Sequence, residues 1–388
     1  MRNVTALGLV SFFTDFSTEM VLGVLPIFIV GTLGASRALL GAIEGSAELT
    51  SYAFRMISGS WSDKVGRRKV FVLAGYTVST ASKPFFAGAN GWIDAFLIRT
   101  SDRMGKGIRT APRDALIADS VPESRAGKAF GIHRTIDQLG AIAGPVAAFA
   151  LLQAVDIRGI FLASLVPGVL ALLILIFFVK EVAVMRKGAR QTIAGNIGRL
   201  LRGNRPFLVL LILAGIFSLG AFNFSFVLIR ATELGVDENL IPLVYAAINI
   251  SHAAIGIPAG VLADRFGKEK MLLVAYASFL ASAALMAVLS GNMIYAYVIA
   301  AVFGLYAGIV ETVQRAIIPR YVSSEVRGTA FGIYNLVIGS CFFASNVVFG
   351  FLWDSQGIVV AVVYSASIAV AAIIGMVLFV SRKYRAIV

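Results

Sequence analysis

Hydrophobic residues fill this chain in twelve long runs, and short polar stretches separate the runs. Each run is close to the roughly 20 residues that an α-helix needs to cross about 30 Å of membrane hydrocarbon. The runs are continuously apolar, whereas strands of a membrane β-barrel would alternate apolar and polar residues. The pattern therefore predicts twelve transmembrane helices, at residues 5–33, 38–62, 70–88, 92–115, 126–153, 158–180, 206–231, 239–262, 271–289, 293–319, 328–352 and 357–381.

The polar loop after the second run occurs twice. Residues 59–69 read GSWSDKVGRRK, and residues 260–270, which stand 201 positions later, read GVLADRFGKEK. The same offset carries Gly127, Phe130 and Gly131 onto glycine, phenylalanine and glycine in the second half. Such a repeat indicates two homologous halves. We therefore expect an all-α integral membrane protein with two pseudo-symmetric six-helix bundles, at residues 1–180 and 206–388, and a cytoplasmic linker at 181–205.

Composition and charge agree with a membrane protein and set its orientation. Hydrophobic residues make up 58% of the chain, charged residues only 14%, and the formal net charge is +13. Lys and Arg gather in the loops on one side, while the other side has only Arg37, Arg158 and Arg230. By the positive-inside rule, both termini should be cytoplasmic in a multi-pass protein of the cell inner (plasma) membrane. The basic collar then lies against anionic lipid, so no nucleic-acid partner is expected.

Several chemistries find no support in the sequence. The phosphate-binding pattern GxxxxGK[ST] does not occur, so any transport should draw on an ion gradient or on the solute gradient. The two histidines, His133 and His252, lie on different predicted helices without thiols at ligand spacing, so we expect neither a metal site nor a cofactor. A membrane enzyme or a sensor is a remote alternative, because neither a catalytic constellation nor a soluble output domain is evident.

Ionisable residues inside the spans carry the strongest functional signal. Each costs about 2.5–3.5 kcal/mol on insertion scales, so it persists where it is paired or useful. A buried carboxylate tends to take up a proton, and a nearby arginine favours its release. The sequence thus predicts proton coupling through residues concentrated in the first half: Glu19, Glu48, Arg103 and Asp137 near the middle of their spans, together with Asp15 and Glu44.

Other polar residues within the spans are candidates for a substrate cavity. Cations recur at three- or four-residue steps on the predicted fourth helix and form one stripe. Such cations could instead neutralise the buried carboxylates, and Glu311 could pair with Arg315 four residues later on its own helix. The predicted cavity residues are Arg99, Lys106, His133, Arg134, Asn223, Asn249, His252, Glu311 and Gln314.

The repeated loop resembles a known family signature. Its first copy is similar to the G-x-x-x-D-x-x-G-R-[RK] motif of the major facilitator superfamily, which implies alternating access between two six-helix domains. The resemblance implies that Asp63 latches the second helix against the eleventh, near residues 323–327, and that Arg67 reaches Asp114. A tight polar turn without a gating role is the alternative. The cytoplasmic gate would comprise Gly59, Asp63, Gly66, Arg67, Arg68, Asp114, Gly260, Asp264 and Gly267.

Two further patterns bear on the function. Gly131, Gly140, Gly144 and Pro145 resemble the antiporter motif of drug and metabolite exporters in this superfamily. The segment that begins at Arg103 resembles the family's R-x-x-Q-G, with lysine in place of glutamine. We therefore expect proton-coupled efflux of a small organic solute by a protein that acts as a monomer among membrane lipids. Proton-coupled uptake or exchange of an organic anion is the alternative.

Overall fold

The computed structural model describes residues 1–122, 125–182, 204–322 and 326–385. Throughout these ranges the chain forms helices joined by turns, without a strand. Each predicted span coincides with one helix or with two or three consecutive helices, so the prediction of an all-α protein is confirmed.

The spans of the first half begin with α1 (Arg2–Leu22), which continues after a break into α2 (Leu25–Ile27) and a π-helix, η1 (Phe28–Thr32). The next five are α3 (Arg37–Val65), α4 (Arg68–Ser82) with the 3-10 helix η2 (Lys83–Gly88), α5 (Trp92–Asp119), α6 (Ala126–Leu151), and α7 (Ile157–Ala163) with α8 (Leu165–Phe178).

The second half repeats this arrangement. It begins with α10 (Arg205–Gly220) and α11 (Phe224–Glu233), which together form one interrupted span. The others are η4 (Glu238–Leu240) with α12 (Ile241–Phe266), α13 (Lys268–Val288), α14 (Ile294–Tyr321), α15 (Arg327–Gln356) and α16 (Ile358–Arg385).

The break between α10 and α11 is held by two buried asparagines. The side-chain oxygen of Asn223 accepts a hydrogen bond from the Ser225 backbone N–H at 2.9 Å and thereby caps α11. The Asn346 side chain accepts the Asn223 backbone N–H at 2.8 Å, so a buried donor keeps a partner. The structure thus gives the Asn223 side chain a capping contact, where the sequence suggested a cavity residue.

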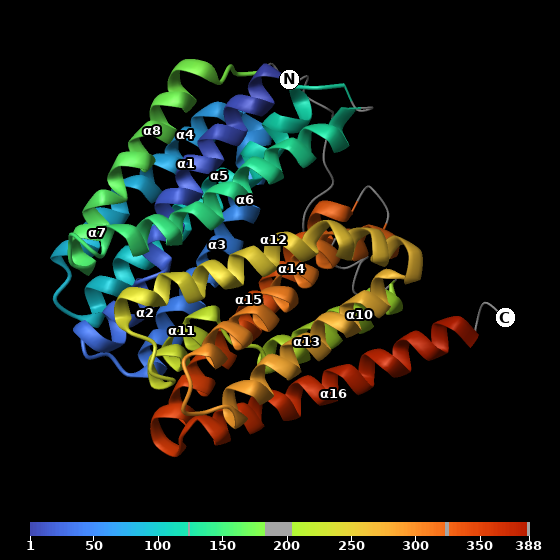
Figure 1. Ribbon diagram of the computed structural model, residues 1–388. Coiled ribbons are helices and arrows are strands. Elements are labelled where there is room, and N and C mark those ends of the chain that lie inside the picture. Colours follow the sequence, from blue (N-terminus) through green and yellow to red (C-terminus); the bar gives the residue numbers. More distant parts are fainter. Residues whose placement is uncertain (123–124, 183–203, 323–325, 386–388) are drawn as a thin grey trace. The chain divides into compact units, whose positions relative to one another are not determined.

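Contacts between residues divide the chain into two compact units (Figure 1). The first unit comprises residues 1–35, 46–188 and 237–246, and the second comprises residues 36–45, 189–236 and 247–388. In the first unit α1 packs against α6 and α8, and α4 packs against α5; in the second, α13 packs against α14 and α16. The domain boundaries expected from the sequence stay a prediction.

Glycines let the helices of the first unit approach closely. A methyl group on Gly105 of α5 would lie 2.6 Å from the carbonyl oxygen of Gly75 on α4. On the neighbouring face of α5, a methyl on Gly107 would lie 2.6 Å from the Ser51 carbonyl oxygen on α3. Such backbone contacts are typical of helix packing in membranes, and here they fix the rotation of α5, which carries most of the buried cations.

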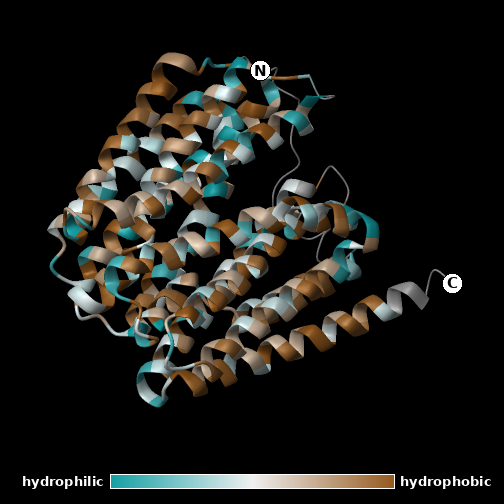
Figure 2. Ribbon diagram, viewed as in Figure 1, coloured by the Kyte–Doolittle hydropathy of each residue, from teal (hydrophilic) through white to brown (hydrophobic). Residues whose placement is uncertain are grey.

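The surface of each unit suits a lipid environment. Large apolar side chains such as Phe177, Ile257 and Val288 are exposed, and apolar residues cover the helices of both units (Figure 2). Eight helical segments of the described chain are long and apolar enough to cross a membrane. The predicted spans outside those eight are α3, α4, α5 and α6. Three of them, α3, α5 and α6, hold the buried ionisable residues predicted for the site, which lower their mean hydropathy.

Candidate functional site

Two predicted carboxyl groups meet in the first unit, on α1 and α6. Gly144 of α6 lies against the backbone of α1, since a methyl there would be 2.6 Å from the Phe16 carbonyl oxygen. Asp137, two turns before Gly144, therefore faces α1, where Asp15 lies. The two carboxyl groups lie close enough to interact directly, and the Arg134 guanidinium donates to Asp137 at 3.1 Å. This is the acid pair of the site.

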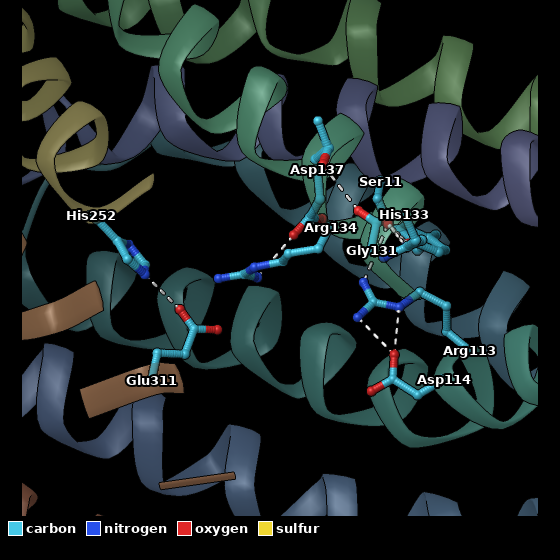
Figure 3. Close-up of polar contacts among 11 residues, drawn as sticks. Ser11, Arg113, Asp114, Gly131, His133, Arg134, Asp137, His252 and Glu311 are labelled. Carbon is cyan, nitrogen blue, oxygen red and sulfur yellow. Dashed lines mark hydrogen bonds and ion pairs between the residues drawn. The ribbon is translucent and has the colours of Figure 1, made fainter. Parts of the chain in front are cut away.

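A second group of polar contacts lies one turn before Asp137 on α6 (Figure 3). His133, one turn before Asp137, is 4% exposed, and its Nε2 lies 2.9 Å from the Ser11 hydroxyl. The Arg113 guanidinium donates to the same hydroxyl at 3.3 Å and to the Asp114 carboxylate at 2.9 Å. Ionisable side chains thus extend from the acid pair toward the end of the bundle that the sequence predicts to be cytoplasmic.

The cation stripe of α5 is largely paired inside the first unit. Arg103 forms an ion pair with Glu48 of α3 at 3.2 Å. Arg99 pairs with Asp102 at 3.1 Å, and both side chains are almost fully enclosed. Arg99 therefore forms an internal salt bridge, which was the alternative to its predicted role in a substrate cavity. Lys106 lies on the same stripe and is partly buried.

A buried lysine was not singled out by the sequence analysis. Lys83, at the start of η2, is 1% exposed, and its ammonium donates to the Thr18 hydroxyl of α1 at 3.1 Å. The neighbouring Asp102 accepts a hydrogen bond from Ser79 at 2.6 Å. A lysine near the end of a predicted span is easily taken for one that reaches the membrane surface. The polar residue Ser79 lies one turn earlier on the same helix face, and it could have indicated that this face is turned toward other helices.

The other two predicted proton-coupling carboxylates lie in different surroundings. Glu19 of α1 accepts a hydrogen bond from the Tyr245 hydroxyl, which the first part of α12 supplies to the first unit. Glu44 is 1% exposed and belongs to the short segment of α3 that the contacts assign to the second unit.

The second unit contains an intramembrane pair of its own. A methyl on Gly308 of α14 would lie 2.6 Å from the His252 carbonyl oxygen of α12, so the two helices touch there. One turn further, Glu311 lies 2.8 Å from the Nε2 of His252 (Figure 3). The expected pairing with Arg315 concerns a side chain outside the described set. Asn249 and Gln314 lie one turn away from this pair on α12 and α14 respectively, and Asn249 is buried.

The first repeated loop turns at a glycine and is closed by an ion pair. Gly66 has φ +72°, a conformation that favours glycine. Arg68 pairs with Asp119 of α5 at 2.6 Å and with Asp63 at 3.5 Å. The expected pairing of Arg67 with Asp114 is not among the contacts of the described residues: Asp114 pairs with Arg113, and Arg67 is exposed just before α4. Residues 323–325, near which Asp63 was expected to bind, lie outside the described ranges.

The second loop contains the same ion pair with its charges exchanged. It also turns at a glycine, Gly267, with φ +103°. Glu269, which is 3% exposed, pairs with Arg320 at 3.1 Å and accepts from the Tyr321 hydroxyl at 2.5 Å. Glu269 and Arg320 stand 201 positions after Arg68 and Asp119. We call these the first and second loop ion pairs. Asp264, by contrast, is exposed and pairs with Lys268 at 2.9 Å.

The glycines of the antiporter-like pattern differ in their surroundings. Gly140 and Gly144 lie against the α1 backbone. Gly131 is exposed, and a methyl there would meet nothing within 4 Å. Pro145 is buried inside α6, and its counterpart in the second half is Asn346. Close helix packing therefore explains why glycine occurs at Gly140 and Gly144, and it does not explain Gly131.

This difference predicts opposite effects of one substitution. We expect Gly144→Ala to destabilise the protein by about 1–3 kcal/mol, because overpacking would push α1 away from α6. Gly131→Ala should stabilise by up to about 1 kcal/mol, because alanine favours an open helix position. The measurement is the unfolding midpoint of the purified protein in detergent. Equal effects of the two changes would contradict the packing seen between α1 and α6.

Comparison with known proteins adds the family to this geometry. The model of the Major Facilitator Superfamily matches residues 7–346 and 210–387. The chain belongs to the major facilitator superfamily. It is 33% identical over 361 residues to an uncharacterised MFS-type transporter of Methanocaldococcus jannaschii, and the match covers 91% of this chain and 88% of that protein. It is therefore a membrane transporter, and the predicted fold with two six-helix bundles is confirmed.

Relatives within the superfamily differ in their described roles. The multidrug resistance protein MdtG of Salmonella typhimurium is 25% identical over 283 residues, which is 71% of this chain and 70% of that protein. The crystal structure of the nucleoside transporter NupG has a TM-score of 0.82 at 14% identity and covers 97% of this chain and 99% of its own. A POT family transporter in complex with 5-aminolevulinic acid has a TM-score of 0.81 at 13% identity, covering 98% and 96%. The two structures show the fold alone.

Proposed function

We propose that this major facilitator is a proton-coupled transporter of a small organic solute and that the acid pair carries the proton. The observation that supports this most directly is the meeting of the Asp15 and Asp137 carboxyl groups where α1 touches α6. Two neighbouring buried carboxylates repel each other, and this repulsion favours a proton on one of them. Arg134 favours the charged form of Asp137, so Asp15 holds the shared proton.

We propose that a proton on this pair moves toward the predicted cytoplasmic side past His133 and Ser11. His133 and Ser11 can each donate and accept hydrogen bonds, and Ser11 joins His133 to the Arg113 and Asp114 pair one turn from Asp137. In the proposed cycle the acid pair gains and loses its proton as the domains alternate. The ion pair of Arg103 and Glu48 exchanges partners in the same cycle. We place the protein in the cell inner membrane, as a monomer with both termini in the cytoplasm.

We propose export as the direction of transport. The antiporter-like glycines at the acid pair support export, as does the similarity to a multidrug resistance protein. The second candidate is proton-coupled uptake or exchange of an organic anion, which the net positive stripe of α5 favours. In either case, we propose that the protein draws its energy from the proton gradient, with no cofactor and no catalytic step of its own.

The experiment is collapse of an imposed pH gradient in inside-out vesicles that contain the protein. Cationic, zwitterionic and anionic solutes are added in turn, and lumenal pH is followed with a dye. For an exporter, a solute should release lumenal protons from vesicles with the wild-type protein and not from empty vesicles. Exchange of pre-loaded solute without any proton release would contradict proton coupling and would indicate a uniporter or an exchanger.

A further inference from the structure

The cation stripe of α5 is uneven in one respect. Its four arginines each have a partner within the first unit, either a carboxylate or an aromatic ring. Lys106 is the exception: no hydrogen bond or ion pair joins its ammonium to any residue in the described ranges. The partners of the arginines are Asp102 for Arg99, Glu48 for Arg103, the Tyr76 ring for Arg109 and Asp114 for Arg113.

The packing of α5 determines where Lys106 points. Successive residues of a helix are rotated by about 100°. Gly105 touches α4 and Gly107 touches α3, so Lys106 projects between those two contacts and is not packed under either neighbour. Arg103 repels its charge, and the carboxylates of Glu48, Asp15 and Glu19 attract it. Lys106 therefore lies in the same part of the unit as the acid pair, and none of these carboxylates is within 4.0 Å of it.

An ammonium inside a membrane span is costly, and it persists where it has a partner or a function. A charge-assisted hydrogen bond from a carboxylate or phosphate would supply the missing partner, and such bonds are roughly twice as strong as neutral ones. When Asp15 holds the shared proton, one negative charge near Lys106 is removed, which favours an incoming anion. We propose that Lys106 binds an anionic group of the transported solute, which is thus an organic anion.

This inference rests on the proposed transport function and names its substrate class. The resemblance to R-x-x-Q-G supplies the test variant, because Lys106→Gln introduces the residue of that pattern and removes the charge at similar length. Lys106→Arg keeps the charge. Lys64→Gln is the matched control, since it removes one positive charge from an exposed position in the same unit.

The experiment measures binding to the purified full chain in detergent, at fixed pH and without a gradient. A polar small-molecule extract of cells is separated by ion exchange into anionic, neutral and cationic pools, and each pool is tested for a rise in the unfolding midpoint. The anionic pool should stabilise the wild type, Lys106→Arg and Lys64→Gln. Lys106→Gln should need about tenfold more of that pool for the same rise, because it lacks the charge-assisted bond.

Three results would overturn the proposal: no stabilisation by the anionic pool, stabilisation by the neutral or cationic pool alone, or an unchanged response of Lys106→Gln. Because binding is measured without a pH gradient, each of these leaves the proton-coupling proposal standing. Conversely, vesicles that show exchange without proton release would leave anion binding by Lys106 intact.

Discussion

Vesicles containing Asp137→Asn should lose solute-driven proton release while they keep exchange of pre-loaded solute. Asparagine cannot take part in a shared carboxyl proton, and Arg134 loses its charged partner. Loss of a hydrogen bond to a charged group costs about 1.5–3 kcal/mol, which corresponds to at least a tenfold fall in the coupled rate. The measurement is the initial rate of lumenal pH change in inside-out vesicles, normalised to the amount of protein.

Asp94→Asn is the matched control for this change. Asp94 is exposed in the first turn of α5 and accepts a hydrogen bond from the Asn90 backbone. It should keep the wild-type rate, while Asp15→Asn should behave as Asp137→Asn does. Full proton-driven flux in both acid-pair variants would show that another group carries the proton.

The second large effect concerns the second loop ion pair. Glu269→Arg places a positive charge beside Arg320 at a position that is 3% exposed, and it removes the acceptor of the Tyr321 hydroxyl. Because the Arg320 side chain is 43% exposed, the pair is only half-buried. Loss of a hydrogen bond to a charged group costs about 1.5–3 kcal/mol, so the unfolding midpoint in detergent should fall. The double change Glu269→Arg with Arg320→Glu recreates the charge order of the first loop ion pair and should recover most of the loss.

Lys268→Glu provides the comparison, because it breaks the neighbouring pair with Asp264, whose side chain is 77% exposed. An exposed pair contributes about 0–1 kcal/mol, so this change should be nearly silent. If Glu269→Arg were as mild as Lys268→Glu, or if the double change recovered nothing, the second loop ion pair would have no structural role.

The twelve helices could be predicted because apolar runs of spanning length have few other solutions in a membrane. The meeting of Asp15 and Asp137 was partly accessible, since the glycines at Gly140 and Gly144 mark the face of α6 that a neighbour must approach. The pairing itself needed the identity of that neighbour. Lys83 illustrates the same limit, because its partner Thr18 comes from a helix 65 residues away.

The loops show why a motif does not settle contacts. Arg67 and Arg68 are neighbours in the pattern, yet only Arg68 belongs to α4, and Arg67 precedes the helix with a non-helical backbone. Because α4 begins at Arg68, that residue faces α5 and Arg67 stays outside. In the second loop alone, Glu269 looks like the loss of the arginine that the first loop has at this position. The 201-residue offset must be applied to both partners of the ion pair. It then shows that Arg320 replaces Asp119 and compensates for the change at Glu269.

The central claim is that Asp15 and Asp137 share a proton, and isotope-edited infrared spectroscopy of the purified protein tests it without knowledge of the solute. Aspartate labelled with carbon-13 distinguishes protonated carboxyl groups from carboxylates at neutral pH. The wild type should show a protonated aspartate band that disappears in both Asp15→Asn and Asp137→Asn and remains in Asp94→Asn. A wild-type spectrum with carboxylate bands alone, or a protonated band that persists in both variants, would contradict the account.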